Sequence, residues 1–129
     1  MLILVADDFE ETRSVMRLLL EMKGHAVVEA ADGREAVEGA ISHDPDLILM
    51  DLSMPVMDGF DATRCLRKQA ATARTPIVAL TAHSDHGAWR AKAISCGCNE
   101  CYAKPLDFDA LDRLLSFGSR AAASPKRGH

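Results

Sequence analysis

Five short apolar runs alternate with five longer stretches whose apolar residues recur at helical spacing. The runs cover residues 2–6, 26–30, 47–50, 76–80 and 100–103. Runs of this length, bounded by turn residues, indicate buried strands, whereas the stretches between them have the periodicity of amphipathic helices. Because strands and helices alternate and the connections are short, we expect a parallel sheet with helices on both faces.

The first and last predicted helices have apolar faces that we expect to point inward. The first helix, over residues 10–23, begins with acidic residues, which suit the positive end of its dipole. Its apolar stripe consists of Val15, Leu18, Leu19 and Met22. The last helix begins after Asp107, which we expect to cap it. Its inward residues are predicted to be Phe108, Leu111, Leu114 and Leu115.

Length and charge narrow the class of protein. The 129 residues suit one domain, expected over residues 1–118 and followed by a disordered basic tail over 119–129. A formal net charge of −4 gives no broad attraction to nucleic acid or anionic membranes. No apolar run approaches the roughly 20 residues of a membrane span, and no signal peptide is visible. We therefore expect a cytoplasmic protein whose four cysteines stay reduced.

Polar residues stand where the predicted strands end. Asp7 and Asp8 follow the first strand, Asp51 the third, Thr81 the fourth and Lys104 the fifth. Because ligands bind outside the carboxyl ends of strands in open parallel sheets, we expect all five side chains at one rim. Three neighbouring carboxylates repel one another, and a cation such as Mg²⁺ or Mn²⁺ would relieve the repulsion. A hydroxyl and an ammonium suit an incoming phosphoryl group, with a carboxylate as the nucleophile that forms an aspartyl phosphate.

These residues resemble the receiver domain of two-component response regulators. The resemblance covers about residues 1–118 and rests on four motifs. They are the acid pair Asp7-Asp8, Asp51 within Asp-Leu-Ser-Met-Pro-Val-Met-Asp-Gly, Thr81 within Ala-Leu-Thr-Ala, and Lys104-Pro105. The resemblance implies a flavodoxin-like (βα)5 doubly wound parallel sheet with strand order 2-1-3-4-5. Both a single-domain, chemotaxis-regulator-like protein and the receiver of a hybrid histidine kinase fit it.

The resemblance also implies a role for each matching residue. Asp51 would accept the phosphoryl group. Mg²⁺ would be bound by Asp8, by Asp51, by the backbone carbonyl of Ser53 and, mainly through water, by Asp7. Thr81 would bond one phosphoryl oxygen and Lys104 would pair with another, which neutralises charge as in phosphoryl transfer generally. The Lys104-Pro105 peptide bond is expected to be cis.

The implied function is a phosphorylation-dependent signalling switch. Its donor would be a sensor histidine kinase or a histidine phosphotransfer protein, and it would act on a protein partner or pass the phosphoryl group onward. It would promote its own phosphorylation and dephosphorylation without being a turnover enzyme, and we expect a monomer or weak dimer. Donor docking is expected on the rim and on an exposed face of the first helix that includes Glu11, Arg13, Ser14 and Arg17. Output is expected through the fourth helix, fifth strand and fifth helix, near Trp89, Arg90 and Cys101.

Two other functions remain open. One is a receiver-shaped interaction module that is never phosphorylated, although the complete set of rim residues argues against it. The other is a Mg²⁺-dependent phosphatase that works through an aspartyl phosphate. Such an enzyme needs an acid or base near its nucleophile and a lid over its substrate. Here Ser53 stands two residues after Asp51, and the predicted loops are short.

One position departs from the family pattern. Receivers of this family usually carry Tyr or Phe three residues before the lysine, where this chain has Cys101. The aromatic residue, Tyr102, comes one position later, and one step along a strand turns a side chain to the opposite face. We therefore expect Tyr102 to pack in the core or a side groove, and we expect switching to depend on Thr81 and the loop 82–87.

Three further features have both a structural and a functional interpretation. The spacing Cys96-x-Cys98-x-x-Cys101 could hold a metal, but small hydrophobic packing explains it better because a fourth ligand is missing. His83 and His86 suggest a metal pair, yet a solvated surface is the more common setting. Trp89 marks either a partner-binding helix face or half-buried packing. The basic residues Lys126 and Arg127 are too few to argue for nucleic acid.

Overall fold

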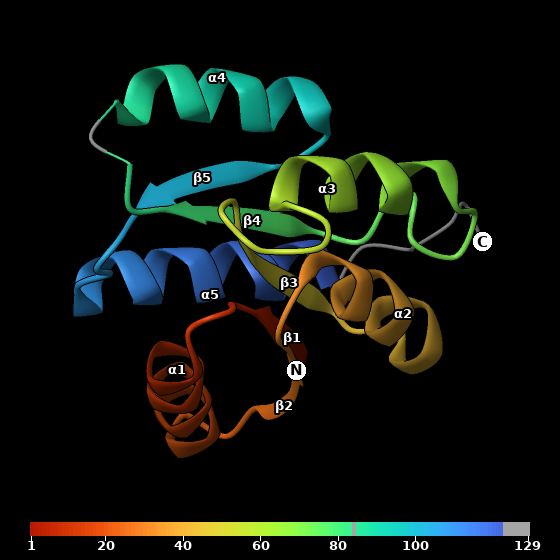
Figure 1. Cartoon of the computed structure of the whole chain (residues 1–129). Helices are drawn as coiled ribbons and strands as arrows, with labels where there is room; N and C mark the ends of the chain where they lie inside the picture. Colours follow the sequence, from red (N-terminus) through yellow and green to blue (C-terminus); the bar gives the residue numbers. More distant parts are fainter. Residues whose placement is uncertain (84, 123–129) are drawn as a thin grey trace.

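The computed structural model describes residues 1–83 and 85–122 as an open sheet covered by helices (Figure 1). The strands are β1 (Leu2–Ala6), β2 (Ala26–Ala30), β3 (Leu47–Asp51), β4 (Ile77–Thr81) and β5 (Glu100–Ala103). The helices are α1 (Glu10–Met22), α2 (Gly33–His43), α3 (Gly59–Lys68), α4 (His86–Cys96) and α5 (Phe108–Ala122). All strand pairs are parallel and the order is β2-β1-β3-β4-β5, which confirms the predicted fold.

Two hydrophobic cores lie on the two faces of the sheet. Side chains alternate between them along each strand. Ile48, Met50, Ile77 and Ala79 pack under α2, α3 and α4. Leu47, Leu49, Val78 and Leu80 pack under α1 and α5. Figure 1 shows the same division of the helices between the two faces. The central strand β3 is buried at every residue, so its end is held rigidly.

The predicted inward face of α1 is wrong for three of its four residues. Val15, Leu18 and Met22 are 57%, 59% and 75% exposed. The helix packs instead through Leu20, with Met16 and Leu19 partly buried beside it. Its sequence carries two overlapping apolar stripes. The choice between them depends on contacts with the rest of the fold, and the inward stripe is the one that also carries Arg13 and Arg17 to Glu29 on β2.

Helix α5 also differs from the prediction. It begins after Asp107, whose side chain accepts a hydrogen bond from the Ala110 N–H at 2.6 Å, so the predicted cap is confirmed. Leu111, Leu114 and Leu115 are buried as expected, whereas Phe108 is 72% exposed. The helix continues to Ala122, past the boundary expected at residue 118. Residues 123–129, which include Lys126 and Arg127, lie outside the described residues.

No helix within residues 1–83 and 85–122 combines the length and the apolar character that crossing a membrane requires.

Candidate functional site

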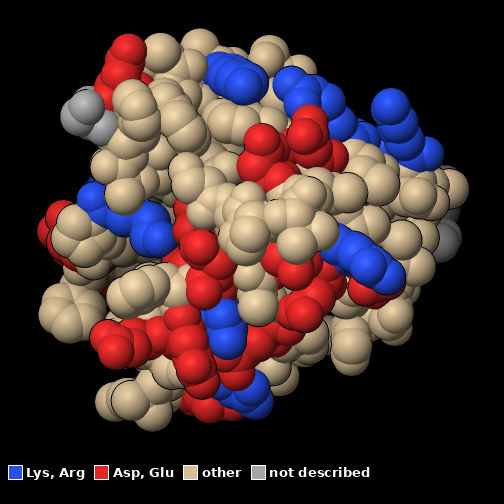
Figure 2. Space-filling model, in the orientation of Figure 1, with Lys and Arg blue, Asp and Glu red and all other residues tan. Residues whose placement is uncertain are grey.

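Three carboxylates meet at the carboxyl ends of β1 and β3. These strands are adjacent and parallel, which brings Asp7 and Asp8 beside Asp51. One carboxylate oxygen from each residue lies within 4.8 Å of the others. Asp7 and Asp51 are 3% and 5% exposed, whereas Asp8 is exposed. Figure 2 shows acidic side chains gathered through the centre and lower half of the face drawn there.

Lys104 supplies the positive charge in this cluster. It follows β5, and its ammonium nitrogen lies 2.8 Å from Asp7 Oδ2 and 3.4 Å from Asp51 Oδ2. Burial alone would lower the pKa of Lys104, but the hydrogen bond to Asp7 and the charges of both carboxylates outweigh burial and raise it. The Lys104-Pro105 peptide bond is cis, as predicted. One ammonium therefore balances part of the charge of three carboxylates.

Burial dominates the electrostatics of Asp51. Burial raises the pKa of its carboxyl, opposed by the hydrogen bond from the Ser53 N–H and by the charge of Lys104. The Ser53 N–H donates to Asp51 Oδ1 at 3.1 Å. Asp7 is held by different contacts, since its Oδ1 accepts a hydrogen bond from the Phe9 N–H at 2.9 Å. Asp7 thus does not cap α1, whose N-cap residue is Phe9 without a side-chain hydrogen bond.

The metal-free Asp51→Asn protein is expected to be more stable than the wild type at pH 7. Since the folded-state pKa of Asp51 is raised, ionising it costs stability, and that cost arises as the pH rises through the folded-state pKa. Asn removes the cost. The difference should shrink as the pH falls toward about 4, near the pKa of an unfolded Asp. Urea unfolding of both proteins in EDTA at several pH values measures this difference in stability. A wild type that is more stable than Asp51→Asn at pH 7 would contradict the raised pKa of Asp51.

Thr81 lies at the end of β4, next to the carboxylates. Asp51 pairs with Leu80 in the sheet register, so Thr81 stands one residue beyond it on the neighbouring strand. Its side chain is buried, and its hydroxyl oxygen accepts a hydrogen bond from the His83 N–H at 3.0 Å. The hydroxyl hydrogen is therefore not used in this bond. The structure thus places all the predicted site residues at one rim, with Ser53 and Thr81 flanking the acidic cluster.

Arg13 is a residue of this site that the sequence analysis misassigned. It was expected on an exposed docking face, but its side chain is 14% exposed. Its guanidinium donates to the Asp7 carbonyl oxygen at 2.8 Å and to Glu29 Oε1 at 2.9 Å. Arg17 likewise pairs with Glu29, at 2.7 Å. Arg13 therefore links α1 to the backbone of the acid pair. The signal in the sequence for this contact is the opposite charge of Glu29 on β2.

Of the three residues expected near the output face, Cys101 does not reach the surface. Cys101 is 4% exposed and packs in the core under α4, where burial raises the pKa of its thiol to about 11. It therefore cannot contribute a side chain to an outer surface. Tyr102 points to the opposite core, which confirms its predicted displacement. Trp89 is half-buried and packs toward the core under α2, α3 and α4.

The other features with two interpretations are also placed by the structure. Cys96 and Cys98 are buried in the same hydrophobic core as Cys101, which confirms hydrophobic packing. The Cys98 sulfur also forms a hydrogen bond of 3.5 Å with Thr63 Oγ1. His83 is exposed and His86 is half-buried. Asp58 caps α3 by accepting a hydrogen bond from the Asp61 N–H at 2.9 Å.

Comparison with known proteins gives consistent matches. Residues 3–116 match the family model of the response regulator receiver domain. The chain is 41% identical over 114 residues to the sensor protein EvgS of Escherichia coli K12. This match covers 88% of this chain but only 9% of EvgS, so the chain spans a small part of that relative. It is 34% identical over 114 residues to PilH of Pseudomonas aeruginosa, covering 88% and 93%. One similar solved structure is the receiver domain of the sensor histidine kinase PA1611 from Pseudomonas aeruginosa, which has magnesium coordinated in its active-site cleft. Its TM-score is 0.83 and its sequence identity is 37%, and the match covers 95% of this chain and 98% of that one.

Proposed function

The chain belongs to the response regulator receiver domain family, the signalling module of two-component phosphorelays, and we propose that Asp51 is its phosphoryl acceptor. The observation that carries the proposal is the buried Asp51 carboxylate, within 4.8 Å of two other carboxylates and 3.4 Å from the Lys104 ammonium. One Asp51 oxygen forms a P–O bond as the P–N bond of a phosphohistidine donor breaks. The donor imidazole leaves with the electron pair of that bond.

The contacts favour Asp51 over its two neighbours as the nucleophile. Both Asp7 oxygens are engaged, one by the Phe9 N–H and one by Lys104 at 2.8 Å. Asp8 is exposed, so it lacks the enclosed setting that protects a reactive ester from water. Among the described residues, the Oδ2 of Asp51 has only the longer 3.4 Å contact with Lys104. Asp51 therefore combines burial with an oxygen that can attack.

The residues at the rim fit a hard divalent cation such as Mg²⁺ or Mn²⁺. The donor set is all oxygen, and within the described residues three carboxylates face one ammonium, that of Lys104. The exposed Asp8 leaves room for the water ligands that Mg²⁺ retains. Asp7, Asp8, Asp51 and the Ser53 carbonyl would hold it. When bound, such a cation neutralises charge on the transferring phosphoryl group.

Two side chains of the chain itself would stabilise the phosphoryl group. The Thr81 hydroxyl accepts from the His83 N–H, so its hydrogen can be donated to a phosphoryl oxygen. Lys104 can exchange its contacts with Asp7 and Asp51 for an ion pair with a second oxygen. Both donors would then stabilise the charge that develops on the transferring phosphoryl group.

We propose that the donor, a sensor histidine kinase or histidine phosphotransfer protein, docks on the apolar face of α1. Val15, Leu18 and Met22 form that face, with Phe9 and Phe108 also exposed. A groove of about 930 Å³ between α1 and α5 connects the acidic cluster to Phe9, Val15 and Phe108. A helical donor could cover this apolar surface while its phosphohistidine reaches Asp51, which agrees with the helix-in-groove mode of recognition.

We assign residues 119–122 to the receiver domain, because α5 continues through them. We infer that the module promotes its own phosphorylation and dephosphorylation and is not a turnover phosphatase. The acid or base that such a phosphatase needs beside its nucleophile is absent at Ser53, and Asp8 leaves the rim open to solvent.

Removing the cation tests the proposed mechanism. Incubation of the wild type with acetyl phosphate and Mg²⁺ is expected to add one labile group of about 80 Da to the intact mass. EDTA should suppress the addition, because the three carboxylates then repel the anionic donor and the Lys104 ammonium offsets part of their charge. Equal labelling with and without EDTA would contradict the metal assignment, and no labelling with Mg²⁺ would favour the unphosphorylated interaction module.

A further inference from the structure

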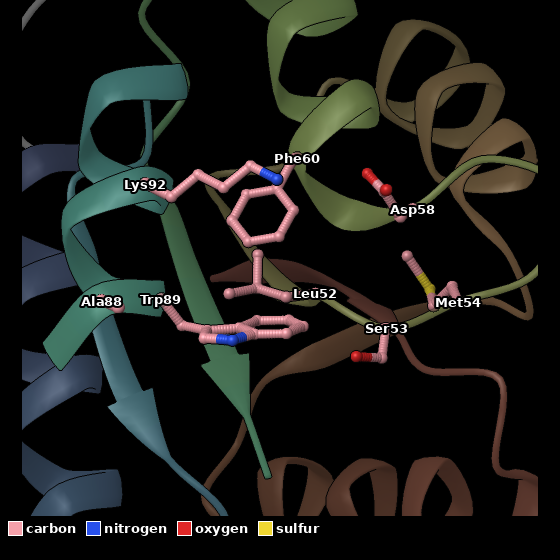
Figure 3. Close-up of a pocket in the computed structure, with 8 residues that line it drawn as sticks. All are labelled: Leu52, Ser53, Met54, Asp58, Phe60, Ala88, Trp89 and Lys92. Carbon is pink, nitrogen blue, oxygen red and sulfur yellow. The ribbon is translucent and has the colours of Figure 1, made fainter. Parts of the chain in front are cut away.

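A cavity between α3 and α4 remains outside the function proposed above. It has a volume of about 570 Å³ and lies beside the β3–α3 loop (Figure 3). Leu52 and Met54 belong to that loop, Phe60 comes from α3, and Trp89 comes from α4. The Phe60 and Trp89 rings approach to 5.4 Å between centroids at an angle of 47°. These four residues give the cavity apolar walls.

The two charged side chains that line the cavity, Asp58 and Lys92, differ in whether they already have a partner. Lys92 holds its ammonium 4.2 Å from the centre of the Phe60 ring. No Asp or Glu within residues 1–83 and 85–122 forms an ion pair with it. Asp58, which also lines the cavity, is already engaged as the cap of α3. The cavity therefore offers apolar surface beside one cation that is free to bind an anion.

We propose that this cavity is a docking site for a partner protein's peptide segment in which a bulky apolar side chain stands next to Asp or Glu. The apolar side chain enters the cavity and packs against Leu52, Phe60 and Trp89, and the carboxylate pairs with Lys92. The volume accommodates a side chain the size of Leu or Phe with adjoining backbone. Lys92 is exposed and its ammonium lies over the Phe60 ring at the edge of the cavity, so an incoming carboxylate can reach it.

A chain of contacts joins the docking site to the acidic cluster. Thr81 accepts a hydrogen bond from the His83 N–H, and the His83 ring stacks on Trp89 with centroids 4.5 Å apart and an angle of 21°. If Thr81 moves to bond a phosphoryl oxygen, it displaces His83 and with it the ring that covers Trp89. This link rests on the proposed function, whereas the docking site itself does not.

Peptide binding followed by NMR tests the docking site on the full chain. The probe is a peptide acetyl-Ser-Leu-Phe-Glu-Ser-amide, and its control has Gln in place of Glu. The Glu peptide is expected to shift the indole N–H signal of Trp89 and to bind about fivefold more tightly than the Gln peptide, as for a partly exposed ion pair. Lys92→Gln should abolish that preference. Arg90→Gln, which removes a cation already paired with Glu100, should preserve it.

The outcomes separate the docking site from its regulation and from the proposed function. Equal binding of the two peptides, or shifts confined to the groove between α1 and α5, would overturn the docking site. Shifts of Trp89 produced by protein concentration alone would overturn the peptide proposal and identify a second copy of the chain as the occupant.

Beryllofluoride is expected to change the peptide affinity several-fold in the wild type and not in His83→Ala. An equal change in both proteins would overturn the link through His83 between Thr81 and Trp89. Mass labelling of Lys92→Gln should match the wild type, so a failure of docking is distinct from a failure of phosphorylation.

Discussion

The Asp51→Asn protein is expected to gain no phosphoryl group from acetyl phosphate or from a phosphohistidine donor. The carboxylate is the attacking group, and an amide nitrogen or oxygen cannot replace it as a nucleophile because its lone pairs are delocalised and uncharged. Neither Asp7 nor Asp8 is arranged to take over, since Asp7 is held by Phe9 and Lys104 and Asp8 is exposed. The expected effect is therefore complete loss of labelling. Intact mass spectrometry measures it directly.

The matched control is Asp58→Asn. Asp58 lies in the same loop as Ser53, and its role is to accept the Asp61 N–H at the start of α3. Asn serves equally well as an N-cap, so this variant should fold and be labelled as the wild type is. Because metal-free Asp51→Asn is expected to be more stable than the wild type at pH 7, its lost labelling is not expected to come from unfolding, and the urea unfolding described above checks this. Labelling that persists in Asp51→Asn would show that another side chain is the acceptor.

The sequence was sufficient for the sheet and for the rim because both depend on local patterns. A run such as Leu47–Met50 is apolar at every residue, as a strand covered on both faces requires. Parallel order then brings the residues after each strand to one edge, whatever the details of the helices. For that reason Asp7, Asp8, Asp51, Thr81 and Lys104 could be grouped before any coordinates were known.

The helix faces could not be predicted in the same way. On α1, the inward stripe is shared between Leu20 and two arginines whose charge is balanced by Glu29 on another element. Counting apolar residues therefore favours the wrong stripe, and it hides the contact between Arg13 and the Asp7 carbonyl. Trp89 is a similar case, because its orientation depends on Phe60, which lies 29 positions earlier. Such pairings are set by tertiary packing and leave no periodic signal.

Arg67→Ala is expected to cost about 3 kcal/mol of stability and to lower the melting temperature by about 10 °C. The Arg67 guanidinium lies between α3 and the ends of two loops. It donates to four carbonyl oxygens, those of Gly97, Thr72, Ala73 and Thr75, and to Asn99 Oδ1. Burial lowers the pKa of this arginine, which reflects the desolvation that these acceptors offset. Removing the side chain leaves several partly buried carbonyls without a donor.

The neighbouring Arg64→Ala substitution provides the comparison for Arg67. Both residues lie on α3, but Arg64 is 46% exposed and pairs only with Asp61 among the contacts of the described residues. Its loss should cost less than about 0.5 kcal/mol, as for an exposed ion pair within a helix. Arg67→Lys should fall between the two, because one ammonium cannot reach acceptors on both loops at once. Thermal and urea unfolding of the three variants measure the order, and equal losses for Arg64→Ala and Arg67→Ala would show that the hydrogen bonds of Arg67 add nothing beyond helix propensity.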